Sequence, residues 1–212
     1  MTFSIIGIDP DDKMIGSAVA SKWTGVGGCV QFFRHGVGFV NMQNHSHAQV
    51  AHRILDKIEG GEDTEQAIEI ALETDATKAA RQCIVKSLHS NKFAVYSGAQ
   101  CTGTFAHKIG KNCAAAGNTI ASKAVIDAMI DAYENSANAP ITEKLLLALE
   151  AGQAAGGDTR GQEAAAIKAY EYTYPQQRFY PIDLRVDHHD TPLVELRKLY
   201  DIFGENERRF VV

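Results

Sequence analysis

The 212-residue sequence lacks paired cysteines, clustered basic residues and any long hydrophobic run. Its four cysteines are scattered along the chain without a C-x-x-C pair, which is typical of reduced thiols in the cytoplasm. No stretch is apolar over the length that a transmembrane helix needs, and the N-terminus lacks the basic-then-apolar plan of a signal peptide. We therefore expect a cytoplasmic protein that has no membrane partner.

Positive charge is also scarce, because 21 Lys and Arg residues face 26 Asp and Glu residues and the formal net charge is −5. This balance argues against a nucleic-acid surface. The apolar fraction of 45% is ordinary for a globular protein, and a chain of 212 residues can bury a core without disulfides or metals. No linker, repeat or low-complexity segment interrupts the sequence. We therefore predict one domain over residues 1–212.

The first element that the sequence predicts is a β-hairpin at the N-terminus. Residues 3–8 alternate with the period of two that is typical of a strand, and residues 15–21 return as a second strand. Residues 9–13 have turn chemistry, because Pro fixes φ and Asp side chains bond to nearby amides. If Met1 is removed, the chain begins with Thr2, which then carries a hydroxyl and a free α-amine. Such an amine titrates near neutrality and can accept the hydroxyl proton, so Thr2 would be both nucleophile and base.

The alternative is that Thr2 has no chemical role. Removal of Met1 before a small residue is common, and most chains with Thr at the second position make no use of it. If Met1 is retained, the Thr2 nitrogen is an amide and cannot act as a base. Residue type alone leaves both interpretations open.

The remaining pattern predicts strands, two helices, strands, two helices, strands and a last helix. Strands are expected near residues 29–33, 36–42, 82–88, 93–97, 101–109, 112–116, 163–170 and 178–186, and helices near 48–59, 63–73, 122–135, 141–154 and from 191 onward. Because the strands arrive as hairpins, antiparallel sheets are favoured over a doubly wound parallel sheet. Two helix pairs that cover such sheets predict an α+β fold, a four-layer α/β/β/α sandwich.

Three further residues are candidates for substrate binding. Asp158 and Arg160 lie in a Gly-flanked loop, where backbone can approach a ligand and Arg can hold a carboxylate with two hydrogen bonds. The alternative is a loop after a helix with an internal ion pair. Asn118 could donate its side-chain amide to an oxyanion, but Asn after Gly is also an ordinary turn residue, and the turn is favoured.

Histidines at positions 45, 47, 188 and 189 are candidate metal ligands by residue type. Adjacent histidines seldom face one ion, and no set of thiolates or carboxylates completes a tetrahedron. We therefore predict no metal and no organic cofactor.

Several motifs stand out: the opening Met1-Thr2-Phe3-Ser4-Ile5, residues 18–22, the stretch from Leu149 to Gly152 that continues through residues 156–161, and residues 183–187. Together they resemble the bacterial family catalogued as domain of unknown function 1028. The resemblance covers nearly the whole chain in order. It implies the fold of the N-terminal-nucleophile (Ntn) hydrolases, which is an α/β/β/α sandwich, and an ancestry in amide-bond hydrolysis.

The resemblance also implies roles for particular residues. It makes Thr2 the leading candidate nucleophile, with Lys22 close enough to stabilise developing charge. The alternative for Lys22 is a solvated lysine at a strand end. The chain departs from the family pattern at Ala116, at residues 163–165 and at residues 105–107. The departures remove two amides and a hydroxyl, so either the substrate differs or the site has decayed.

Two functional hypotheses follow. The first is an Ntn hydrolase that cleaves an amide or peptide-like bond of a small substrate, with Thr2 as nucleophile, Lys22 in support, and Asp158 and Arg160 on the substrate's charged end. The second is a catalytically silent sandwich that binds a small molecule or a protein partner. A homodimer is the default expectation for a sandwich with exposed sheet edges.

Overall fold

The computed structural model describes residues 2–90, 92–173 and 182–210. The strands are β1 (Thr2–Asp9), β2 (Met14–Ser21), β3 (Gln31–Arg34), β4 (Gly38–Asn44), β5 (Arg81–Ser87), β6 (Phe93–Ser97), β7 (Phe105–Ile109), β8 (Cys113–Asn118), β9 (Ala164–Glu171) and β10 (Ile182–Val186). The helices are α1 (Ala48–Glu59), α2 (Thr64–Glu73), α3 (Ala124–Asn135), α4 (Ile141–Ala154) and α5 (Pro192–Phe210), with short 3-10 turns η1 (Val26–Gly28) and η2 (Lys78–Ala80).

The strands form two sheets, one with the order β10-β9-β2-β1-β8-β7 and one with the order β3-β4-β5-β6. Every neighbouring pair in these sheets is antiparallel. The predicted α+β class with antiparallel sheets is therefore confirmed. None of the described helices has both the length and the apolar character needed to cross a membrane.

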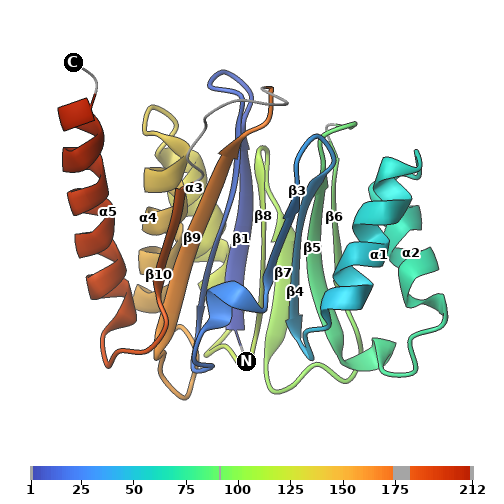
Figure 1. The fold of residues 1–212 in the computed structure, drawn as a ribbon. Helices are drawn as coiled ribbons and strands as arrows, with labels where there is room; N and C mark the ends of the chain where they lie inside the picture. The colour runs from blue at the N-terminus through green and yellow to red at the C-terminus, as the bar shows by residue number, and fades with distance from the viewer. Residues whose placement is uncertain (1, 91, 174–181, 211–212) are drawn as a thin grey trace.

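The two sheets lie face to face between two layers of helices (Figure 1). Helices α3, α4 and α5 cover the outer face of the larger sheet, and α1 and α2 cover the outer face of the smaller one. Side chains along β1 point alternately to the two faces of the larger sheet. Phe3 and Ile5 pack under the helices, whereas Ser4 and Ile6 face the other sheet. Because Thr2 has the same parity as Ser4, it also faces the smaller sheet.

The N-terminal hairpin has the predicted form. Its register runs from Thr2 opposite Ser21 to Asp9 opposite Met14, and Asp9 Oδ1 accepts hydrogen bonds from two backbone N–H groups of the turn. The other oxygen of Asp9 lies 2.7 Å from Lys144 Nζ of α4, in a pair that is almost completely buried. This ion pair ties the turn to the helix layer.

The helices also follow the sequence pattern closely. Helix α1 buries Val50, Ile54, Leu55 and Ile58, and it ends at Gly60 as predicted. Helix α2 begins after Asp63, whose side chain accepts hydrogen bonds from the backbone N–H groups two and three residues later.

Several predicted strand limits were wrong, and β7, for example, begins at Phe105 rather than near residue 101. The sharp bend expected at Gly117-Asn118 does not occur there, because both residues belong to β8 and pair with Phe3 and Thr2. Glycine suits this strand position because an added Cβ would lie 2.8 Å from Ile120 Cγ2. The strand predicted near residues 36–42 continues two residues further, since Gln43 and Asn44 still pair with β5. Residues 178–181 of the last predicted strand lie outside the described residues.

Candidate functional site

A pocket of about 460 Å³ lies between the ends of the two sheets, where β1 begins. Thr2 contributes from β1, the segment between β2 and β3 contributes one wall, and the end of β4 with the start of β5 contributes the other. The lining residues are Thr2, Trp23, Val26, Cys29, Val30, Gln43, Asn44, His45, Ser46 and Arg81. The volume falls within the range of about 300–1,000 Å³ that small-molecule sites occupy.

Thr2 lies in a row of polar residues at the end of the larger sheet. It pairs with Ser21 on one side and with Asn118 on the other, so the three side chains share the face that points at the smaller sheet. Thr2 is 4% exposed, and its Oγ1 donates to Ser21 Oγ at 3.2 Å. Ser21 Oγ also accepts from the backbone N–H of Trp23 at 3.0 Å. The Thr2 hydroxyl is therefore held in one orientation at the pocket wall.

Asn118 is fully buried beside Thr2. Its Nδ2 donates to Gln82 Oε1 at 3.0 Å, whereas its Oδ1 has no hydrogen-bond partner among the described residues. A buried acceptor without a partner is uncommon in folded proteins. If Asn118 donates to an oxyanion, it must use the second N–H of Nδ2, because the first is bonded to Gln82.

A chain of side-chain amides connects this row to the smaller sheet. Gln43 Oε1 accepts from Ser4 Oγ at 2.7 Å, and Gln43 Nε2 donates to Gln82 Oε1 at 2.8 Å and to the Ala116 carbonyl at 3.1 Å. Gln82 Nε2 in turn donates to Ser97 Oγ at 2.9 Å. Sequence reasoning missed Gln43 and Gln82, although polar residues at one parity of otherwise apolar strands were a visible signal.

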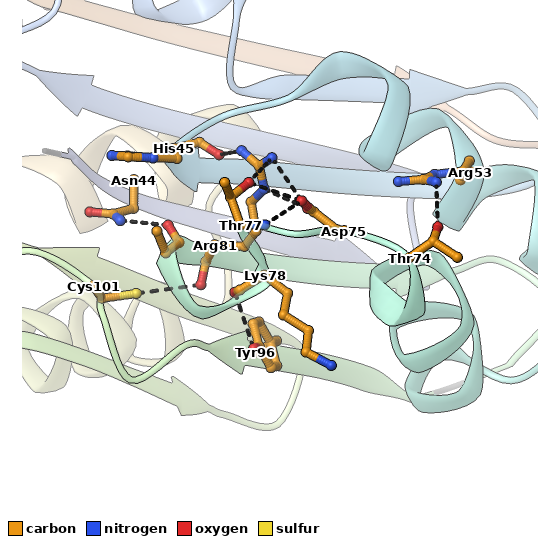
Figure 2. Close-up of polar contacts among 11 residues, drawn as sticks. Asn44, His45, Arg53, Thr74, Asp75, Thr77, Lys78, Arg81, Tyr96 and Cys101 are labelled. Carbon is orange, nitrogen blue, oxygen red and sulfur yellow. Dashed lines mark hydrogen bonds and ion pairs between the residues drawn. The ribbon is translucent and has the colours of Figure 1, made fainter.

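Arg81 holds the polar wall of the pocket in place (Figure 2). Its Nε lies 2.8 Å from Asp75 Oδ2, and Nη2 donates to Thr77 Oγ1 at 2.7 Å, while Nη1 donates to the His45 carbonyl. The hydrogen bonds from Arg81 keep the pKa of Asp75 well below its ordinary value. Arg81 is almost completely buried, and nothing in its local sequence pattern predicted this role.

Asn44 completes that wall. It has a positive φ of 64°, its Nδ2 donates to the Ala80 carbonyl at 2.5 Å, and its Oδ1 accepts from the backbone N–H of Thr102 at 3.2 Å. Figure 2 shows Asn44 and Arg81 joining the end of β4 to the start of β5.

Lys22, the predicted support for Thr2, lies in an ion pair. Its Nζ is 2.5 Å from Glu163 Oε1, and Glu163 Oε2 is 3.7 Å from His188 Nδ1. The hydrogen bond from Lys22 lowers the pKa of Glu163. Because the Glu163 N–H donates to the Ser21 carbonyl at 2.9 Å, this pair lies beside the polar row. Lys22 is not among the lining residues of the pocket.

Asp158 and Arg160 form the internal ion pair that was the alternative to a binding role. Arg160 Nη2 lies 2.9 Å from Asp158 Oδ2, and Asp158 Oδ1 accepts from the Arg160 backbone N–H at 3.0 Å. Ile120 and Asp158 form an isolated β-bridge, and the Thr159 N–H donates to the Thr119 carbonyl at 3.0 Å. The loop therefore packs against the residues that directly follow Asn118, outside the pocket lining.

Burial raises the pKa of Cys29, the one cysteine on the pocket lining, so its thiol stays protonated. Within the described part of the chain, no group of three or more His, Cys, Asp or Glu side chains is arranged to hold a metal ion.

The fold and the site together define a two-sheet α+β protein with a polar-walled pocket where its N-terminal strand begins. The chain belongs to the family described as "Family of unknown function (DUF1028)", whose model matches residues 2–196. The crystal structure of protein SPO2555 from Silicibacter pomeroyi, of the same family, is similar with a TM-score of 0.85 and 28% sequence identity. That similarity covers 94% of this chain and 84% of the other chain. No curated protein matches the sequence.

Proposed function

We propose that this protein is an Ntn hydrolase that cleaves an amide or peptide-like bond of a small substrate. One observation carries the proposal: Thr2 lines a pocket between the ends of the two sheets. The order of helices, sheet, sheet and helices is the one expected of the Ntn-hydrolase fold, and the proposal includes that kinship.

The proposed reaction needs only groups of the chain itself. Removal of Met1 converts the Thr2 nitrogen into an α-amine, which takes the proton of Oγ1 while Oγ1 attacks the substrate carbonyl carbon. The C–N bond then breaks, the leaving amine receives that proton, and an ester to Thr2 remains. Water hydrolyses the ester and restores the hydroxyl. Ser21 Oγ, at 3.2 Å from Thr2 Oγ1, supports the orientation of the nucleophile.

The other candidates have supporting roles in this proposal. Lys22 contributes positive charge from the end of β2, although the Glu163 carboxylate at 2.5 Å offsets much of it. Asn118 fixes the strand beside Thr2 through its bond to Gln82. Asp158 and Arg160 hold their loop against the end of β8.

Mass spectrometry of the intact mature protein tests the first requirement, since retention of Met1 rules out the amine as base. Turnover is then measured as release of amine from short peptides and N-acyl amino acid amides. We expect Thr2→Ala to lower the rate by about 10³-fold or more, and Thr2→Ser to keep a measurable rate because it keeps the hydroxyl. Unchanged turnover by Thr2→Ala would refute the mechanism.

The second candidate function is a catalytically silent sandwich that binds a small molecule or a protein partner. The ion pairs favour this function. Lys22, Arg81 and Arg160 each contact a carboxylate of the chain, which offsets the positive charge that catalysis would use. In that case the mature protein binds ligands beside Thr2 without releasing amine, and Thr2→Ala leaves binding unchanged.

A further inference from the structure

The pocket beside Thr2 has no unpaired acidic or basic side chain among its described lining residues except His45, whose side chain lies at the exposed rim. The Thr2 α-amine adds no charge in the state that the proposed function requires, because only the neutral amine can act as the base. Among the described lining residues, Arg81 is the only Lys, Arg, Asp or Glu. Its guanidinium is bonded to Asp75 through Nε and Nη2 and to neutral oxygens through Nη1 and Nη2. A ligand carboxylate would have to compete with Asp75 for a buried cation, which makes an anionic ligand unfavourable here.

One wall of the pocket is apolar and carries an exposed indole. Val26 and Val30 are buried with Val19 and two alanines of β9, whereas Trp23 is 69% exposed. The Trp23 backbone is anchored by its N–H to Ser21 Oγ, and the Gly25 N–H donates to the Asp187 carbonyl at 2.8 Å. A fixed backbone therefore presents a large apolar ring at the mouth of the pocket, where it can pack against an apolar group of a ligand.

The opposite wall offers hydrogen-bond acceptors. The Thr2 hydroxyl donates to Ser21 Oγ, and the Ser46 hydroxyl donates to the Cys29 carbonyl. A hydroxyl that has donated its proton can still accept through its lone pairs. The proposed function uses the Thr2 oxygen for attack, so the Ser46 oxygen is the one that favours a ligand with an N–H group.

We propose that the pocket takes an uncharged secondary amide, whose apolar side group packs against Val26, Val30 and Trp23 and whose N–H donates to the hydroxyl oxygen of Ser46. The inference rests on the proposed function, because it names the substrate class of that same site. It differs from the expectation of a charged substrate end held by Asp158 and Arg160, since both of these residues lie outside the pocket lining.

A fluorescence titration tests the substrate class directly, because Trp23 is the only tryptophan of the chain. The full-length Thr2→Ala variant is titrated with N-acetyl-L-leucinamide and, separately, with N-acetyl-L-leucine, which differs by a free carboxylate. We expect the amide to shift the Trp23 emission to the blue with saturation, and to bind at least about tenfold more tightly than the acid. Equal or tighter binding of the acid overturns the proposal, as does an amide titration without a saturable shift up to the solubility limit.

Two variants test the contribution of the indole by calorimetry, with circular dichroism confirming that each is folded. Trp23→Ala is expected to weaken amide binding at least about fivefold, whereas the matched variant Trp23→Phe keeps a ring and most of the affinity. Unchanged affinity in Trp23→Ala would show that the indole is no part of the site and overturn the proposal.

His45→Gln is expected to keep the preference for the amide, and loss of that preference would assign the selectivity to the imidazole instead.

These readouts separate the two proposals. Selective amide binding by a protein that releases no amine supports the substrate class and refutes the hydrolase. Amine release without selectivity for uncharged amides supports the hydrolase and refutes the substrate class.

Discussion

Removal of the Asp75 carboxylate is expected to be the most damaging single change at the pocket wall. The side chains of Arg81 and Asp75 are 6% and 7% exposed, so Asp75→Ala leaves a buried guanidinium bonded only to neutral oxygens. Breaking a buried pair from one side costs about 3–5 kcal/mol. Because domains are stable by only about 5–15 kcal/mol, this loss is a large fraction of the total. For a chain of this size it corresponds to a drop in Tm of about 6–20 °C.

The pH dependence of this loss has a definite sign. Arg81 depresses the pKa of Asp75 below its ordinary 3.8, so the contribution of the carboxylate is complete above that value and is lost as pH falls through the lower folded-state pKa. The difference in unfolding free energy between wild type and Asp75→Ala should therefore be constant from about pH 5 to pH 8 and shrink in stronger acid. Urea unfolding at several pH values, followed by circular dichroism, measures it.

Asp127→Ala is the matched control, since it removes a carboxylate from an ion pair at the surface. Asp127 Oδ1 lies 2.6 Å from Lys108 Nζ, but the two side chains are 54% and 44% exposed. Its loss is expected to cost far less than the loss of Asp75, because water and salt screen an exposed ion pair. If Asp75→Ala and Asp127→Ala lower the unfolding free energy equally, burial does not determine the strength of the Arg81 pair and the reasoning fails.

Further substitutions test the interior of the sandwich by the same urea measurement. Lys86 is 1% exposed, and burial lowers its pKa to about 8. The folded protein is therefore most stable above the ordinary pKa of 10.5, where Lys86 is neutral in both states. That stability is lost as pH falls through 8, because the buried amine then becomes charged. Lys86→Met removes this charge together with the hydrogen bond from Nζ to the Ser90 carbonyl, so its effect on the unfolding free energy should be more favourable at neutral pH than above pH 10.5, which a pH-independent difference would contradict. Gln82→Ala removes the acceptor of Asn118 Nδ2 and should cost about 1–3 kcal/mol, which a neutral result would disprove. Gly7→Ala places a methyl group against the Tyr133 ring and should cost about 1–3 kcal/mol, unless the ring moves aside freely.

The parts of the fold that the sequence predicted are those whose signals are local. The N-terminal hairpin followed from alternation and turn residues, and helix α2 followed from Asp63 and a buried stripe. The bend predicted at Gly117-Asn118 was wrong because glycine has two uses: it permits turns, and it also fits where no Cβ has room. Only the packing of Ile120 against Gly117 distinguishes these uses, and that contact is tertiary.

The candidate site shows the same division between local and long-range information. Alternation along β1 is enough to place Thr2 on the same face as Ser4, and the antiparallel register then brings Ser21 and Asn118 beside it. The charged residues behave differently, because the chemistry of a cation depends on the nearest carboxylate. For Lys22 that carboxylate is Glu163, a partner that β9 brings alongside β2 from far along the chain.

The ion pair between Lys22 and Glu163 weakens the role that the sequence predicts for Lys22 beside Thr2. A lysine at the end of β2 could serve a neighbouring nucleophile only if its charge were available, and a carboxylate at 2.5 Å makes it less available. Glu163→Gln removes that carboxylate and should release the ammonium, and a higher rate of amine release from that variant would show that Lys22 acts on Thr2. An unchanged rate would mean that Lys22 is only a strand-end lysine.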